Sequence, residues 1–290
     1  MPNLLVRNSN GKREVISILP DGAVFICYFE PQDCWFFAKP NDDILYRLDS
    51  SGEIEELYKF KGLARIYGIC CNMSNVFMAD INGSVRSYAL GALTTYSVTG
   101  EVAKREIIHK RRGFEPDSGN FFSHDHSRDL LYYVFPKSKC IGTIDGTSHV
   151  EIEFGNKKEE FSIGKSSDLC SFSNPVSIAA TRNGRILVAD KDSHSVFMFK
   201  SDVKQHPFVD IFGTPMTPGN KDGDLSKASF TSPTALLSLG KNIMVADNDG
   251  TRIRLIDMGK LTINTLCETG SKIICLTTDF EKNPCWIEEG

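Results

Sequence analysis

The chain has 290 residues, of which 41% are hydrophobic and 24% are charged, and its formal net charge at pH 7 is −4. This composition is typical of a globular protein with a sizeable core, and the small negative charge gives no general attraction to nucleic acid or to anionic membranes. No apolar run reaches the roughly 18 residues that a membrane-spanning helix needs, so we expect no membrane partner.

The nine cysteines follow no regular spacing, and two of them, Cys70 and Cys71, are adjacent. No CxxC motif is present, although zinc sites and redox sites commonly use one. The N-terminal segment lacks the long apolar stretch of a secretory signal. We therefore expect free, mostly buried thiols and a cytoplasmic protein.

The elements expected along the chain are short strands. Apolar runs recur from the N-terminus onward, among them AVFICYF, CWFFA, ILYRL, LLYYVF, RILVA and NIMVA. They are rich in Val, Ile, Phe and Tyr, and turn sequences such as SSG, ING and NDG follow many of them. Helical periodicity is hard to find. The pattern predicts an all-β chain.

A repeated sequence indicates how the strands are organised. The stretch SNPVSIAATRNGRILVADKDSHSVFMF, at 173–199, matches TSPTALLSLGKNIMVADNDGTRIRLI, at 231–256, at a proline and at the Val-Ala-Asp triplet. Weaker copies contain Ala79-Asp80 and Ala38 at the same place. Repeats of about 40 to 55 residues made of short strands are typical of a β-propeller, whose blades bury their faces against their neighbours.

Counting four strands per repeat predicts a single domain over 1–290, a six-bladed β-propeller of four-stranded antiparallel blades. Five blades follow one another along the chain. The N-terminal and C-terminal strands share the remaining blade, which closes the ring and leaves no exposed sheet edge. The expected blades are about 22–60, 63–99, 121–154, 172–212, 230–269, and 271–290 plus 3–19.

The strongest repeats resemble the NHL repeat over about 165–256. A lead with Asp222 and Gly223 is followed by Ala228, Phe230, Pro233, the triplet at 245–247 and Arg252-Ile253. The preceding repeat matches similarly, although Ser195 stands where arginine is typical. The chain contains neither the Trp-Asp pair of WD40 repeats nor the Gly-Gly pair of kelch repeats. The resemblance implies a six-bladed NHL-type propeller. Such domains are similar in fold to six-bladed lactonases and the amidating lyase, yet most act as binding platforms.

Three aspartates, Asp80, Asp190 and Asp247, each follow a predicted strand at the same place in its repeat. Repeated carboxylates could surround a cation. An aspartate just past a strand also accepts hydrogen bonds from backbone N–H groups of the following turn. We expect this structural turn role for all three.

The histidines suggest a metal site only weakly. His124 and His126 are two residues apart and share a face of an extended strand, but zinc needs a third ligand. The predicted inner strands offer few of the carboxylates that calcium needs, and neither GxSxG nor HExxH occurs. We therefore expect no catalytic residue, no metal and no cofactor. A metal-dependent hydrolase or lyase of the six-bladed type, lactonase-like or amidating-lyase-like, stays as an alternative.

A basic stretch, KREIIHKRRGFEP, follows the second predicted blade. Connections between blades lie on the same face as the turns after each Val-Ala-Asp triplet, so this face gathers further cations. The candidate binding residues are Lys104, Arg105, Lys110, Arg111, Arg112, Lys137, Lys139, Lys191, His194 and Arg252. Some NHL domains bind single-stranded RNA through such a face, which requires aromatic stacking partners. The candidate aromatics are Phe114, Phe121 and Phe122.

Taken with the NHL resemblance, these features favour a binding protein over an enzyme. A rigid ring offers loops of varied sequence on one face, and the sequence shows no convergent set of catalytic groups. We expect a non-enzymatic scaffold that holds a protein partner on its loop-rich face. RNA binding through the basic stretch is the further alternative.

Overall fold

The computed structural model describes residues 2–60, 66–80, 85–89, 121–125, 128, 130–135, 139–144, 150–155, 161–163, 170–200 and 208–290. Contacts within the chain define two compact units. The first unit contains Met1–Glu115 and Thr277–Gly290, and the second contains Pro116–Leu276. The single domain expected over 1–290 therefore stays a prediction.

The described residues form strands almost throughout. One short 3-10 helix, η1, spans Glu30–Gln32, and no helix in the described part is long and apolar enough to cross a membrane. The strands of the first unit are β1 (Leu4–Ser9), β2 (Lys12–Ile18), β3 (Phe25–Phe29), β4 (Cys34–Ala38), β5 (Ile44–Asp49), β6 (Ile54–Lys59), β7 (Ile66–Cys71), β8 (Asn75–Asp80), β9 (Val85–Ala89) and β24 (Pro284–Glu288). The strands of the second unit are β10 (Phe122–Asp125), β11 (Leu130–Phe135), β12 (Cys140–Ile144), β13 (Val150–Phe154), β14 (Pro175–Ala180), β15 (Arg185–Asp190), β16 (Ser195–Lys200), β17 (Phe208–Phe212), β18 (Gly223–Asp224), β19 (Ala235–Leu239), β20 (Asn242–Asp247), β21 (Arg252–Asp257) and β22 (Thr262–Glu268). The division between the units falls within β23 (Ile273–Thr278).

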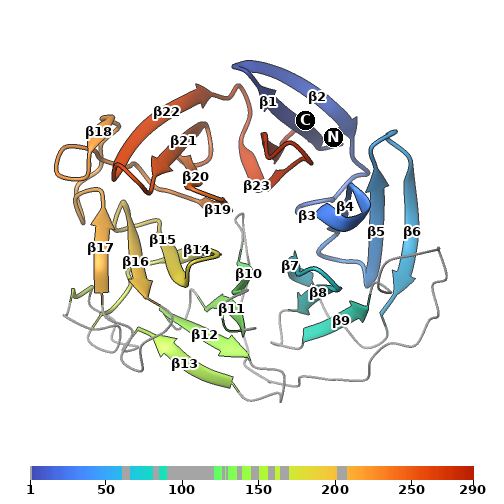
Figure 1. Ribbon diagram of the computed structural model, residues 1–290, viewed down its shortest axis with the longest axis horizontal. Coiled ribbons are helices and arrows are strands. Elements are labelled where there is room, and N and C mark those ends of the chain that lie inside the picture. The colour runs from blue at the N-terminus through green and yellow to red at the C-terminus, as the bar shows by residue number, and fades with distance from the viewer. Residues whose placement is uncertain are drawn as a thin grey trace. The chain divides into compact units, whose positions relative to one another are not determined.

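Antiparallel pairing joins these strands into sheets, which confirms the all-β prediction. Within the second unit, the sheets follow one another like propeller blades (Figure 1). Consecutive strands form the sheets β3 to β6, β10 to β13 and β14 to β17, and a further sheet adds β18 to β19 through β22. Six four-stranded blades are expected, but only five of the described sheets have four strands or more. The sheet of β7, β8 and β9 has three, and the rest of the blade expected over 63–99 lies outside the described part.

The remaining sheet contains strands from both ends of the sequence, in the order β2-β1-β24-β23. In its register Leu5 is opposite Ile287, and Val6 is opposite Trp286. All four of these side chains are fully buried, so the pairing is held by apolar packing as well as by backbone hydrogen bonds. Closure of a six-bladed ring by this sheet stays a prediction.

Within the second unit, β10, β14 and β19 lie on the inner side and β13, β17 and β22 on the outer side (Figure 1). Hydroxyl groups join the inner strands. The Ser123 Oγ accepts a hydrogen bond of 3.0 Å from the Ala180 N–H, and the Ser177 Oγ accepts one of 2.9 Å from the Leu236 N–H. Each serine belongs to one sheet and its donor to the next, so these bonds set the spacing between neighbouring blades.

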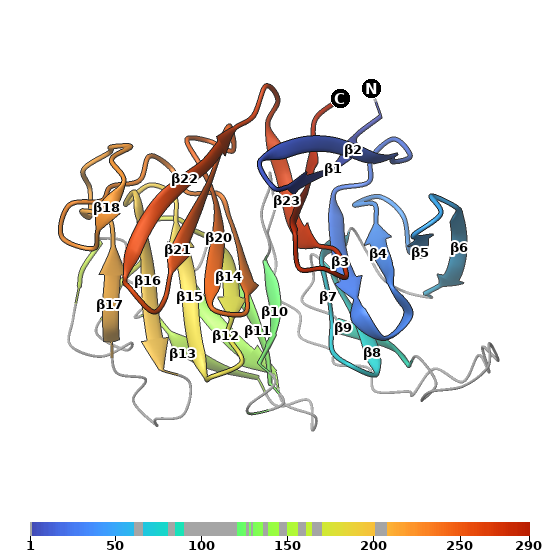
Figure 2. The same ribbon diagram turned by 45° about the horizontal axis from the view of Figure 1, so that its top comes forward.

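An apolar core fills the space between the sheets β14 to β17 and β19 to β22, which stand side by side in Figure 2. Its buried members are Ala179, Leu187, Ala189, Val196, Met198, Phe212, Ala228, Phe230, Leu236, Ile243, Val245, Ile256 and Ile263. Ala228 and Phe230 come from the segment that leads into β19. The core thus packs this segment against both sheets, and its burial supplies the main stabilising term.

None of the nine cysteines is in a disulfide, and six of them are buried. Cys27, Cys71 and Cys267 are partly exposed. The expectation of mostly buried thiols outside disulfides is confirmed. The cellular compartment stays a prediction.

Two glycines after outer strands allow a close approach of the backbone. Gly155 follows β13 and Gly213 follows β17, and both have φ near +93°. A Cβ at Gly213 would lie 2.8 Å from the carbonyl oxygen of His194, and one at Gly155 would lie 2.5 Å from that of Lys139. Both carbonyls belong to residues in the turn before the third strand of the sheet, so glycine lets the chain leave one sheet tightly against that turn.

Replacing Gly213 with alanine should lower the free energy of unfolding by about 2 to 3 kcal/mol, because backbone strain at positive φ adds to the clash with His194. Gly52 is a matched control, since its φ is +89° but nothing lies within 4 Å of a Cβ placed there. The alanine variant at Gly52 should lower the free energy of unfolding by only about 1 kcal/mol. Urea unfolding of both variants measures the difference, and equal losses would contradict the close-approach explanation.

Candidate functional site

Lys191 and His194 lie in the turn that joins β15 to β16. Arg252 begins β21, directly after the turn at 248–251. His194, Asn248 and Asp249 have positive φ values, between 54° and 56°, a conformation that short polar residues adopt more readily than others. We use the name turn face for residues 191–194, 231–232 and 248–251 of the second unit.

Three contacts lock the parts of the turn face together. The Lys191 Nζ lies 3.0 Å from the Asp249 Oδ1, which joins the turns of two neighbouring sheets. The His194 Nδ1 accepts a hydrogen bond of 3.1 Å from the Ser232 N–H, and the Asn248 N–H donates to the Thr231 carbonyl at 2.7 Å. The turn face is therefore one connected set of polar groups.

The remaining candidate cations differ in their surroundings. Arg252 pairs with Glu268 at 2.6 Å and is mostly shielded, with a side chain 14% exposed. Lys139 is partly buried before β12, and its φ is 50°. The predicted residues Lys104, Arg105, Lys110, Arg111, Arg112 and Lys137 lie outside the described part of the chain.

The aspartates that end β15 and β20 are fully buried. Asp190 accepts hydrogen bonds of 2.7 Å from the N–H groups of Ser173 and Asn174. Asp247 accepts one of 2.9 Å from the Thr231 N–H. These donors precede the first strand of the same sheet, so each carboxylate anchors a lead-in segment. The following turns also supply hydrogen bonds, from Ser193 to Asp190 and from the Asn248 N–H to Asp247. Sequence analysis expected donors in these turns only, because the antiparallel partner of a strand end is invisible in a linear pattern.

Asp80 ends β8, where its backbone pairs with Ile66. Its position in the sheet matches those of Asp190 and Asp247, since each ends the second strand. The structural turn role of the three aspartates stays a prediction.

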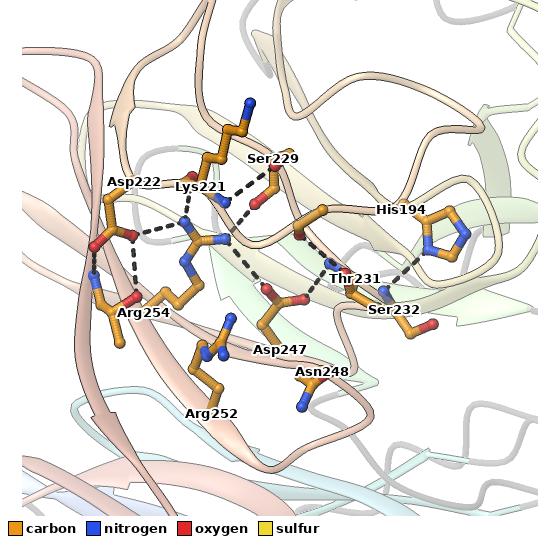
Figure 3. A network of polar contacts seen from close by, with 12 residues as sticks. His194, Lys221, Asp222, Ser229, Thr231, Ser232, Asp247, Asn248, Arg252 and Arg254 are labelled. Atoms are coloured by element: carbon orange, nitrogen blue, oxygen red, sulfur yellow. Dashed lines mark hydrogen bonds and ion pairs between the residues drawn. The ribbon is translucent and has the colours of Figure 1, made fainter.

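A buried arginine that sequence analysis missed connects Asp247 to a second segment (Figure 3). The Arg254 side chain is fully buried, 3.2 Å from the Asp247 Oδ2 and 2.7 Å from the Asp222 Oδ1. It also donates to the carbonyl oxygens of Lys221, at 2.7 Å, and Ser229. Its guanidinium carbon lies 5.0 Å from the centre of the Phe230 ring, within range of a cation–π contact. A charged residue inside the apolar stretch RIRLI was the available signal, because such a residue needs buried partners.

Burial and hydrogen bonds act in opposite directions on the pKa values of these carboxylates. Burial raises the pKa of Asp247 to about 6, although Arg254 and backbone N–H groups favour the charged form. Burial likewise raises the pKa of Asp190. For Asp222, burial is outweighed by hydrogen bonds from Thr265 and Arg254, and its pKa is lowered.

The described residues offer few candidate ligands for a metal and few candidate stacking partners for RNA. No group of three or more His, Cys, Asp or Glu side chains there could hold a metal ion. His124 is buried on β10, while its expected partner His126 lies outside the described part. Phe121 and Phe122 are buried, so they are wrong as stacking partners for RNA bases. Phe114 lies outside the described residues.

A comparison with protein-family models agrees with the repeat predicted from the sequence. The family model of the NHL repeat matches residues 172–199, which contain β14, β15 and most of β16. No curated protein matches this chain in sequence.

Solved structures share the fold at low identity. A nidogen/laminin complex contains a chain 11% identical, with a TM-score of 0.61 over 100% of this chain and 99% of that one. Virginiamycin B lyase from Staphylococcus aureus is 12% identical, with a TM-score of 0.60 over 98% and 87%. An auxiliary nutrient binding protein from Bacteroides thetaiotaomicron is 12% identical, with a TM-score of 0.63 over 100% and 78%. The chain is therefore a β-propeller of antiparallel sheets that carries an NHL repeat.

The raised pKa of Asp247 predicts how stability depends on pH. A carboxyl with a higher pKa in the folded state binds its proton more tightly when folded, so its contribution is greatest in acid and declines as pH rises. Urea unfolding of the wild type and of Asp247→Asn gives two stability curves. Their difference should fall by up to about 3 kcal/mol between pH 4 and pH 7.

Subtracting the Asp247→Asn curve removes the contribution of Asp190, which both proteins share. A difference that stays flat, or that rises with pH, would contradict the dominance of burial at Asp247.

Proposed function

We propose that this chain is a non-enzymatic binding scaffold that holds a protein partner on the turn face. The observation that carries the proposal is the ion pair of Lys191 with Asp249, which joins turns from two neighbouring sheets. Each turn directly follows a buried aspartate, Asp190 or Asp247, whose carboxylate accepts backbone hydrogen bonds. Loops held in fixed positions by a rigid framework bind partners at a low cost in conformational entropy.

The charges of the turn face favour protein over nucleic acid as the partner. Lys191 pairs with Asp249 and is followed in the chain by Asp192, so both signs occur over a short distance, and Asp192, Asn248 and Asp249 are exposed. A phosphate backbone requires a uniformly positive surface, whereas protein interfaces commonly match mixed charges. One structure of similar fold is a nidogen/laminin complex, which gives a precedent for protein binding by this fold. The proposal needs only the second unit and does not depend on closure of a six-bladed ring.

A charge exchange tests the proposal. The double variant Lys191→Glu with Asp249→Lys keeps an ion pair but reverses its direction, so the turns should stay joined. Because exposed ion pairs contribute about 1 kcal/mol or less, the melting temperature should change little. We expect proteins captured by the wild type from a cell extract, after chemical crosslinking and mass spectrometry, to be at least ten times less abundant with the double variant.

Lys241→Glu is the matched control. Lys241 is exposed and precedes β20, whereas Asp249 follows that strand, so the control reverses a charge at the opposite end of the same sheet. It should capture the same proteins as the wild type. Equal capture by all three proteins would contradict a role for the turn face.

Two measurements test the alternatives on the same samples. Filter binding of mixed single-stranded RNA over a salt series would favour RNA if the wild type bound below micromolar and its affinity fell steeply with salt. Stoichiometric zinc or calcium in the purified protein would favour the hydrolase or lyase alternative. Either result would contradict the protein scaffold.

A further inference from the structure

Two cysteines of the first unit lie on neighbouring sheets. Cys27 is in the middle of β3, and Cys71 is the last residue of β7. These two strands contact each other as the first strands of adjacent sheets, and they are drawn close together in both ribbon views (Figures 1 and 2). Both cysteines are partly exposed, unlike the buried Cys34 and Cys70 nearby.

Hydrogen bonds bring the two sulfur atoms together. The Cys27 and Cys71 side chains are hydrogen-bonded to each other. The Cys71 thiol also donates to the carbonyl oxygen of Tyr28, at 3.1 Å. Because Tyr28 follows Cys27 on β3, both contacts hold Cys71 against the same strand. The two side chains are therefore in contact across two sheets, and contact between the sulfur atoms is the first requirement for a disulfide.

We propose that Cys27 and Cys71 form an oxidation site, at which a peroxide converts the two thiols into a disulfide that ties β3 to β7. The reaction links two sheets that are otherwise held by packing and weaker polar contacts. It provides a covalent modification of the first unit, independent of the turn face in the second.

The first step takes place at Cys71. Burial raises the pKa of Cys27 well above its ordinary value, and the hydrogen bond to Cys71 adds to this effect. Cys27 therefore stays protonated at neutral pH and is a poor first nucleophile. The Cys71 thiolate attacks one oxygen of hydrogen peroxide, the O–O bond breaks, and the released hydroxide takes up the thiol's proton as water. Cys71 becomes a sulfenic acid.

The second step forms the disulfide. The Cys27 sulfur attacks the Cys71 sulfur, and the S–O bond breaks. The departing oxygen leaves as a second water, which carries away the Cys27 proton. Overall, two thiols are oxidised to one disulfide while one peroxide is reduced to two waters.

The test treats the native, full-length protein with hydrogen peroxide and then blocks the remaining thiols with an alkylating reagent under denaturing conditions. Mass spectrometry should find two fewer alkylated residues than the nine cysteines of the reduced protein. The peptides that contain Cys27 and Cys71 should be crosslinked, and a thiol reductant should separate them. Nine alkylated cysteines after oxidation, or crosslinking of another pair, would overturn the proposal.

Four variants identify which cysteines form the crosslink and which one is oxidised first. Cys27→Ser and Cys71→Ser should each abolish the crosslink, and Cys27→Ser should leave a sulfenic acid on Cys71 that a dimedone probe labels. Cys34→Ala and Cys70→Ala are matched controls, because they remove neighbouring thiols on the same two sheets and should leave the crosslink intact. A crosslink that persists in Cys71→Ser, or that is lost in Cys70→Ala, would contradict the assignment.

Discussion

A buried carboxylate needs hydrogen-bond donors, and Asp190 and Asp247 find them both in the turns that follow and in the segments that lead into their own sheets. Leaving such a group unsatisfied costs about 1 to 3 kcal/mol or more. The constraint therefore acts on backbone that is distant in sequence. It fixes Ser173 and Asn174 beside the end of β15, and Thr231 beside the end of β20. Because these segments adjoin the turns at 191–194 and 248–251, the carboxylates also set where the turn face lies.

Arg254 extends this constraint in the last repeat of the second unit. Its guanidinium joins Asp247 to Asp222 and to two backbone carbonyls. Burying an arginine is unfavourable, and replacing a buried ion pair with apolar residues is often neutral or stabilising. A structural reason for keeping it is positional: the same side chain contacts both ends of the segment from Lys221 to Ser229. This segment also supplies Ala228 to the core and precedes Phe230.

Much of the fold could be predicted from the sequence because it depends on local and repeated signals. The Val-Ala-Asp triplets at 188–190 and 245–247 mark the ends of second strands, and turn residues separate the strands. The pairing of β1 with β24 follows from the number of strands left at each end. The units identified by contacts, by contrast, depend on packing between sheets, which a strand count does not contain.

The candidate site was less predictable, because its contacts join residues that are far apart in sequence. Lys191 and His194 could be placed in one turn, but their partners Asp249 and Ser232 come from the next repeat. Arg252 matches the arginine that is typical of the repeat, whereas Arg254 is the one that holds the buried network together. Phe121 and Phe122 were candidates for stacking, but both are buried. The sequence does not distinguish the two cases, because an aromatic residue beside a turn is equally suited to a core.

The central claim is that the buried aspartates hold the lead-in segments in place, and native-state hydrogen exchange of single amides tests it most directly. The account predicts that the N–H groups of Ser173, Asn174 and Thr231 exchange as slowly as the paired amides of β15 and β20, because each donates to a buried carboxylate. The exposed turn at Gly240 and Lys241 gives the reference for fast exchange. Exchange of the three amides at the rate of that turn would contradict the account.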